Sequence, residues 1–190
     1  IRRRWLPIDL DPIRPSGISS NEDEHQAALQ KALDIREWLI SRGWPASAFI
    51  LADSGNGGHL AVKIDLANDT DARDLVKACL ESLDATFSDK AVKVDTTTYN
   101  AARIWKLYGT MARKGSSTTD RPHRLAKILD APSPEALEIV SREQLEALAA
   151  IRPAKEQSAT TQNSQKGADF DPVRYAEAHG AKVLRTKAWN

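Results

Sequence analysis

The chain has 190 residues, of which 41% are hydrophobic, and its 27 Lys and Arg nearly balance its 26 Asp and Glu. This length and composition predict one sizeable core with some tail, and no run approaches the roughly 18 apolar residues that a membrane span requires. A single cysteine, Cys79, excludes an internal disulfide and a cysteine-based zinc site, so a reducing, intracellular location is the simpler expectation.

The first predicted element is a strand over residues 5–11, WLPIDLD, because hydrophobic and polar residues alternate at its end. Ile8 and Leu10 fall on one face, whereas Asp9 and Asp11 fall on the other. The strand is therefore half-buried, with two acids on its polar side.

Two helices are predicted from hydrophobic residues at helical spacing. The first follows Ser19, which forms a capping box with Glu22 in the sequence pattern. The second runs from about residue 71 to 87, with Thr70 as its cap and Cys79 in its buried stripe. His25, in the first helix, is expected to be a structural hydrogen-bonding residue.

Further strands are predicted around a glycine-rich turn in FILADSGNGGHLAVKIDL, and again in KAVKVDTT and ARIWKLYGT. His59 and Lys63 lie on the polar face of the strand after the turn, and Asp95 lies on the polar face of KAVKVDTT. A basic loop follows, and helical signal then covers residues 134–150. Between Asn100 and Lys127 seven cations accompany one acid, which indicates a patch that can bind phosphates.

The fold class expected from these elements is α+β. Because the strands keep one polar face, we expect an open mixed or antiparallel sheet with helices on one side and a working surface on the other. The expected organisation is a core over residues 1–130, a helical extension over 131–152, a flexible linker over 153–168, and the start of a following module over 169–190.

Asp9 and Asp11 emerge on the same side of their strand, about 6.6 Å apart at the backbone. Two unpaired carboxylates this close repel each other, which favours a divalent ion between them, and oxygen ligands favour Mg²⁺ or Mn²⁺. Asp95 would complete a two-metal phosphoryl-transfer site. The alternatives are two solvent-exposed acids for the first pair and a strand-terminal cap for Asp95.

The SGNGGH turn can hold a triphosphate, because backbone at Gly55 and Gly57 can approach an anion closely while His59 and Lys63 follow on one face. The alternative is an ordinary hairpin turn. Cations of the basic segment suit phosphate oxygens, although a solvated basic face is the alternative for each: Arg103, Lys106, Arg113, Lys114, Arg121 and Arg124. A regular strand would send Arg103 and Lys106 to opposite faces. Trp105 and Tyr108 would stack on bases or belong to the core.

Three motifs in order, PIDLDP, GGHL and KVD, together with the stretch ARIWKLYGTMARKG, resemble the archaeo-eukaryotic primase superfamily. The resemblance is to the primase-polymerase branch of phage, plasmid and prophage replication proteins, and it covers about residues 1–128. It implies an RRM-like sheet packed on helices. Members carry sequence before the first motif that is missing here, and they are often joined to a helicase.

The resemblance implies that the chain is an enzyme, a DNA primase or polymerase that adds nucleoside triphosphates to a strand on a single-stranded or primed DNA template. Asp9, Asp11 and Asp95 would hold Mg²⁺ or Mn²⁺, whereas His59, Ser54 and the glycine turn would contact the phosphates of a dNTP or NTP. Arg103 and Lys106 would neutralise the same triphosphate. A cytoplasmic location in a bacterial or phage-infected cell follows. The competing interpretations are a metal-dependent nuclease and a non-catalytic module that binds single-stranded DNA.

Overall fold

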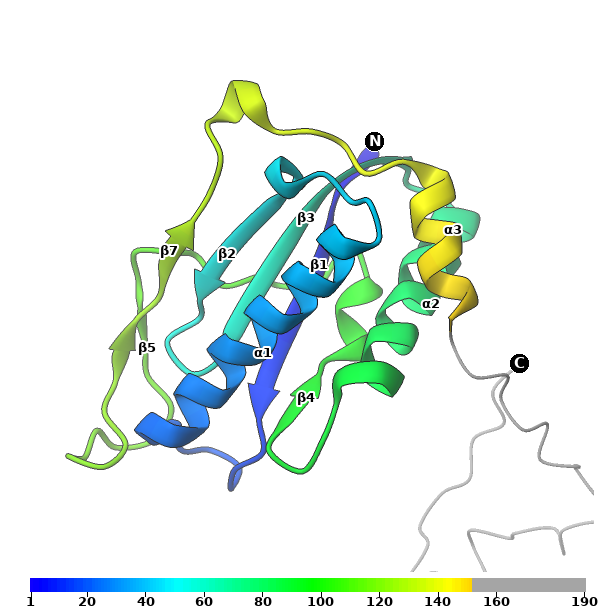
Figure 1. Ribbon diagram of the computed structural model, residues 1–190. Coiled ribbons are helices and arrows are strands. Elements are labelled where there is room, and N and C mark those ends of the chain that lie inside the picture. Colours follow the sequence, from blue (N-terminus) through cyan, green and yellow to red (C-terminus); the bar gives the residue numbers. More distant parts are fainter. Residues whose placement is uncertain (152–190) are drawn as a thin grey trace, which may run out of the picture. The chain divides into compact units, whose positions relative to one another are not determined.

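Five strands form the main sheet of the computed structural model, which describes residues 1–151 (Figure 1). The sheet has the order β4-β1-β3-β2-β7, and every neighbouring pair in it is antiparallel. The strands are β1 (Arg2–Pro12), β2 (Phe49–Asp53), β3 (Gly58–Ala67), β4 (Val92–Val94) and β7 (Lys127–Asp130). A separate two-stranded sheet joins β5 (Met111–Ala112) to β6 (Arg124–Leu125).

Helices α1 (Glu22–Ser41) and α2 (Thr70–Phe87) cover one face of the main sheet (Figure 1). Helix α3 (Arg142–Ala150) packs against α2. Short 3₁₀ turns connect these elements: η1 (Ala46–Ala48), η2 (Thr96–Tyr99) and η3 (Pro134–Ala136). The expected α+β class is confirmed, with an antiparallel main sheet that leaves its other face uncovered by helices.

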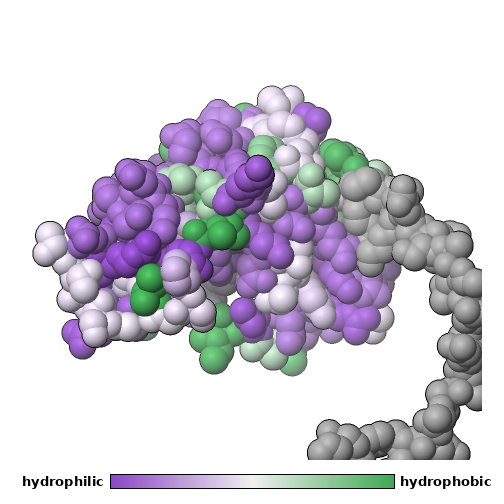
Figure 2. Space-filling model, turned by 90° about the horizontal axis from the view of Figure 1, so that it is seen from below, coloured by the Kyte–Doolittle hydropathy of each residue, from purple (hydrophilic) through white to green (hydrophobic). Residues whose placement is uncertain are grey.

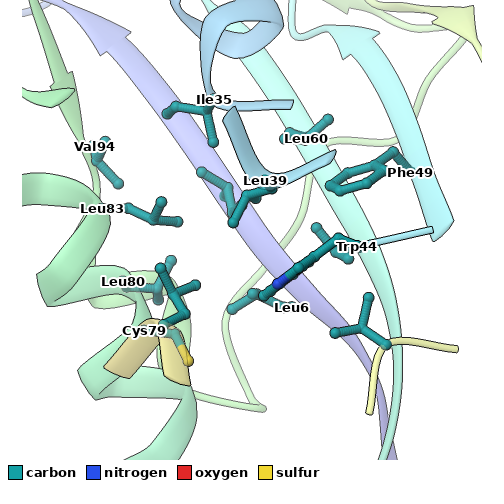
Figure 3. Close-up of a cluster of buried hydrophobic side chains, with 14 of the residues drawn as sticks. Leu6, Ile35, Leu39, Trp44, Phe49, Leu60, Cys79, Leu80, Leu83 and Val94 are labelled. Carbon is teal, nitrogen blue, oxygen red and sulfur yellow. The ribbon is translucent and has the colours of Figure 1, made fainter. Parts of the chain in front are cut away.

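The hydrophobic core lies between the sheet and the helices (Figure 3). Alternate residues of β1 point into it, and Leu6, Ile8 and Leu10 are fully buried. Their burial contributes about 1.5–3 kcal/mol per large side chain. Cys79 is also buried, as expected, and burial raises the pKa of its thiol to about 12.

The structure corrects both predicted helix caps. Asn21, and not Ser19, accepts from the Glu24 amide, and Glu24 completes the capping box of α1. Ser19 is buried and donates instead to the Lys114 carbonyl. Asp69, and not Thr70, caps α2 by accepting from the Ala72 amide. Both predictions chose a residue with the right chemistry close to the residue that makes the contact.

The predicted strand ARIWKLYGT is wrong, because residues 102–109 form turns and irregular backbone. Ile104 and Leu107 in this segment are 92% and 73% exposed, so the apolar residues that indicated a strand are not buried. Strand β7 has no counterpart in the prediction. It pairs with β2 at the sheet edge, and all four of its residues are exposed, so it lacks the half-buried alternation that marks a strand.

Residues 1–151 belong to one compact unit. Leu145 and Leu148 of α3 join the common core, and the Val140 amide donates to the Lys63 carbonyl at 2.9 Å. The helical extension expected over 131–152 is therefore, as far as residue 151, integral to the core. The predicted linker (153–168) and following module (169–190) lie outside the described residues.

Figure 2 shows one face on which hydrophilic residues predominate and hydrophobic residues form separate patches. Within residues 1–151, no helix combines the length and the apolar character needed to cross a membrane.

Candidate active site

The candidate site is centred on Asp9 in β1, which lies between β4 and β3 in the main sheet. Its register partner on β3 is His59, and the two side chains approach to 3.3 Å between Oδ1 and Nε2. On the other side, the Asp95 amide donates to the Asp9 carbonyl at 2.8 Å and continues the β1–β4 register. Asp95, Asp9 and His59 therefore form one row across the open face of the sheet.

A cavity of about 570 Å³ lies over this row. The three acids predicted from sequence line it together, although they come from two strands far apart in the chain. Nine of the predicted site residues are in its wall: Asp9, Asp11, Ser54, His59, Asp95, Arg103, Lys106, Arg113 and Lys114. Carboxylates thus lie on the sheet, and cations come from the segment that follows β4.

Asp11 lies among charges of both signs in this cavity. Burial and the neighbouring Asp9 carboxylate raise the pKa of Asp11, and Asp95 adds to the rise, whereas Lys114 and Arg14 oppose it. The nearest Arg14 nitrogen is 3.6 Å from Asp11 Oδ1. Because 49% of the Asp11 side chain is exposed, solvent weakens these interactions but leaves their sign unchanged. Burial and the two neighbouring acids therefore disfavour the charged form of Asp11, and the two cations oppose them.

Asp95 also caps η2, as the alternative interpretation expected. Its Oδ1 accepts from the amide and hydroxyl of Thr97, at 2.8 and 2.7 Å, and its Oδ2 is 3.3 Å from Arg103. Within residues 1–151, no three His, Cys, Asp or Glu side chains are grouped closely enough to hold one metal ion. Carboxylate oxygens are ligands that Mg²⁺ and Mn²⁺ prefer. In this arrangement, however, Thr97 and Arg103 engage the Asp95 carboxylate.

His59 belongs to a chain of hydrogen bonds that determines its tautomer. The Trp105 indole N–H donates to the Tyr108 hydroxyl at 3.1 Å, and this hydroxyl is 3.1 Å from His59 Nδ1. Burial raises the pKa of Tyr108, so its hydroxyl keeps its proton and can donate to Nδ1. The neutral imidazole then carries its proton on Nε2, which faces Asp9.

Arg103 and Lys106 both reach the cavity because their segment is irregular. In a regular strand, residues three apart would point to opposite faces. Lys106 donates to the Met111 carbonyl at 3.1 Å, which ties its segment to β5. Because no strand forms here, Arg103 and Lys106 are not forced to opposite faces, and both can serve one site.

The glycine turn has its amides engaged within the protein. The Gly55 amide donates to Asp53, and the Gly57 amide donates to the Ser54 hydroxyl at 2.9 Å. Ser54 lines the cavity, whereas Gly55 and Gly57 do not. A Cβ on Gly57 would lie 2.2 Å from the Leu10 carbonyl oxygen, so close packing against β1 explains this glycine.

Three predicted binding cations lie outside the cavity wall. Lys63 is four residues beyond His59 on β3, and its Nζ lies 4.8 Å from the Trp5 ring centroid. Arg121 forms a two-pronged ion pair with Glu24, at 2.7 and 2.9 Å. Arg124 pairs with Glu22 at 3.0 Å and donates to the Ser20 carbonyl. The two arginines hold the basic loop on the N-terminal end of α1.

Sequence reasoning missed Asn56 and Thr98, which also line the cavity. Asn56 is 5% exposed and accepts from the Ser20 amide, and Thr98 donates to the Pro7 carbonyl beside β4. Asn56 lies inside the SGNGGH motif, so its position in the turn was the available signal. The sequence around Thr98 contained no such signal, because a short 3₁₀ turn has no periodicity that a sequence pattern can reveal.

The fold and the site define an α+β protein with an acidic cavity, bordered by cations, on the open face of an antiparallel sheet. Comparisons with protein-family models, curated proteins and solved structures gave no match to this chain.

Proposed function

We propose that this chain is a template-directed nucleotidyltransferase of the primase-polymerase type. The observation that carries the proposal is the row Asp95, Asp9 and His59, with Asp11 beside it, in a cavity that Arg103, Lys106, Arg113 and Lys114 also line. Carboxylates that can hold divalent ions and cations that can hold a triphosphate are the two requirements of such a site.

The topology supports the same proposal. The elements β1, α1, β2, β3, α2 and β4 follow one another, and the sheet order is β4-β1-β3-β2. This β-α-β-β-α-β arrangement is the one expected of an RRM-like core. It agrees with the primase resemblance of the motifs that contain Asp9, His59 and Asp95.

In the proposed reaction, the 3′ hydroxyl oxygen of the growing strand bonds to the α-phosphorus of the incoming nucleotide. The bond from that phosphorus to the bridging oxygen breaks, and pyrophosphate leaves. Mg²⁺ or Mn²⁺ held by Asp9, Asp11 and Asp95 would stabilise the charge on the attacking and leaving oxygens. The 3′ hydroxyl proton passes to solvent as the bond forms.

The cations and His59 would bind the triphosphate. Lys106 and Lys114 line the same cavity as the acids and lower the electrostatic cost of bringing a polyanion next to carboxylates. Arg103 is paired with Asp95 in the free protein, so its transfer to a phosphate oxygen would release the Asp95 carboxylate. His59 lines the same cavity, and its Nε2, 3.3 Å from Asp9 Oδ1, would be a further donor.

Primer extension tests the proposal. The protein is mixed with a primed DNA template, one dNTP or NTP and Mg²⁺ or Mn²⁺, and both primer length and pyrophosphate are measured. We expect Asp11→Asn to reduce incorporation at least about a hundredfold, as loss of a charge-stabilising group does in other enzymes. Asp34→Asn, an exposed α1 residue bonded to Gln30, is the matched control.

The two competing functions give different results in the same assay. Template shortening without a triphosphate would identify a metal-dependent nuclease. DNA binding that survives chelation and Asp9→Asn, without incorporation under either metal, would identify a non-catalytic binding module. A helicase partner stays a prediction of the resemblance and is tested by co-purification.

A further inference from the structure

A second concavity lies on the open sheet face next to the acidic cavity. Its volume is about 660 Å³, within the range of about 300–1,000 Å³ typical of ligand sites. Thr98, Arg103 and Trp105 line both concavities, so the two are adjacent and share a wall. The new concavity, which we term the Trp5 groove, extends toward the start of β1.

The floor of the Trp5 groove is formed by apolar residues of three neighbouring strands. Pro7, Ala61 and Ile50 are register partners across β1, β3 and β2, and they form the next row on the open face after Asp9 and His59. Trp5 occupies the row beyond, opposite Lys63. Because each row is two residues further along β1, Trp5 lies about 13 Å from Asp9 along the strand.

The rim of the groove carries excess positive charge. Arg2 and Arg4 line it and share a single carboxylate, Asp65. The Lys63 ammonium lies over the Trp5 ring. Arg3 Nε is buried and has no acceptor within residues 1–151. An apolar floor, the partly buried Trp5 indole and more cations than acids together complement a ligand with flat apolar faces and a polyanionic backbone.

We infer that the Trp5 groove binds unpaired bases of a single-stranded nucleic acid, with Trp5 as a stacking platform and Arg4 on the backbone. Asn68 and Asn100 also line the groove, and their amides can donate to and accept from base edges. The inference rests on the proposed function, because it makes the groove the track of the template strand into the acidic cavity. The groove would then provide the strand contacts that the sequence assigned to Arg121 and Arg124. Those two side chains are paired with Glu24 and Glu22.

Fluorescence anisotropy with a labelled oligothymidylate of about 12 nucleotides, in EDTA, tests the inference with the whole chain. We expect Trp5→Ala to weaken binding about tenfold or more, and Trp5→Phe to retain most of the affinity, because the phenyl ring still stacks. Arg4→Ala should weaken binding and reduce the slope of log affinity against log salt by about 0.7. Arg36→Ala, whose side chain pairs with Asp130, is the control and should bind like the parent.

Two results would overturn the inference. One is a parent protein that does not bind the oligonucleotide. The other is that Trp5→Ala and Arg4→Ala both fold and both bind the oligonucleotide as the parent does, whether or not Trp5→Ala disrupts self-association. Asp9→Asn separates this inference from the proposed function, since groove binding should survive it. If the parent binds the oligonucleotide through Trp5 but does not incorporate nucleotides, the groove inference stands and the polymerase proposal fails. If the parent incorporates nucleotides but binding does not depend on Trp5, the polymerase proposal stands and the groove inference fails.

Discussion

The Asp95 amide donates to the Asp9 carbonyl at 2.8 Å, and this bond fixes the face of the sheet on which Asp95 emerges. Side chains alternate along a strand, so a slip of one residue between β1 and β4 would turn Asp95 into the core. The buried side chains of Val92 and Val94 oppose such a slip, because it would expose them. Core packing of β4 thereby positions a site residue.

The turn before His59 depends on the small size of Gly57. We expect Gly57→Ala to lower the free energy of unfolding by more than about 3 kcal/mol, because its Cβ would lie 2.2 Å from the backbone oxygen of Leu10. Gly43→Ala is the control. It has open space around the new Cβ but a φ of +83°, and should cost about 1–2 kcal/mol. Urea denaturation measures both, and equal losses would contradict the packing explanation.

Much of the fold was predictable because its signals are local. The alternation in β1, β3 and β4 correctly assigned Asp9, His59 and Asp95 to the polar face. In a half-buried strand, the alternation of hydrophobic and polar residues shows which side chains face the core. Residues 102–109 were not predictable in this way. Ile104 and Leu107 suggest a strand, but no core position is available to them.

The hydrogen-bond chain through Tyr108 gives a spectroscopic prediction. Tyr108→Phe keeps the ring but removes the donor to His59 Nδ1, so the Nε2–H tautomer should lose its preference over the Nδ1–H form. Long-range ¹H–¹⁵N spectra of the imidazole report the tautomer directly. Tyr99→Phe is the control, since Tyr99 lies under Lys77 and away from His59. An unchanged His59 spectrum in Tyr108→Phe would show that another group fixes the tautomer.

Asp53 connects the glycine turn to α1 and makes stability depend on pH. Burial acts to raise the pKa of Asp53, but hydrogen bonds from His25 and the Gly55 amide outweigh it, and the pKa falls below the ordinary 3.8. A lowered carboxyl pKa stabilises the fold above the unfolded-state value and loses that stabilisation as the pH falls through the folded-state value. The structural role expected of His25 is confirmed by this bond.

Asp53→Asn should therefore cost about 1–2 kcal/mol at pH 7, because it removes a buried charge-assisted acceptor. The difference from the parent should shrink as the pH falls below 3.8. Thermal unfolding from pH 7 to pH 2 measures this dependence. Asp120→Asn, in an exposed loop, should show no such trend. A difference for Asp53→Asn that is constant with pH would contradict the lowered pKa of Asp53.

Asp11 should show the opposite effect on stability. Its pKa is raised, so ionisation of Asp11 destabilises the fold once the pH rises through the folded-state value. We expect Asp11→Asn to raise the free energy of unfolding at pH 7 by up to about 0.5 kcal/mol while incorporation is lost, since half of the side chain is exposed. Urea denaturation without divalent ions checks the sign. A clear destabilisation would mean that Asp11 serves the fold.

The partners of the cations could not be predicted from sequence. Arg121 and Arg124 read as free positive charge, but each meets an acid of the first turn of α1, about a hundred residues earlier in the chain. Arg113 and Lys114, from the same loop, do reach the cavity. Composition identifies a basic segment, whereas only the tertiary contacts decide which of its charges are available.

The most direct test of the central claim is a crystal of the protein soaked with Mn²⁺ and a non-hydrolysable nucleoside triphosphate, with Mn²⁺ located by its anomalous signal. The account predicts Mn²⁺ bound by Asp9, Asp11 and Asp95, with the triphosphate against Lys106 and Arg103 now turned from Asp95 to phosphate. Mn²⁺ and nucleotide bound elsewhere, with the Arg103–Asp95 pair intact, would contradict it.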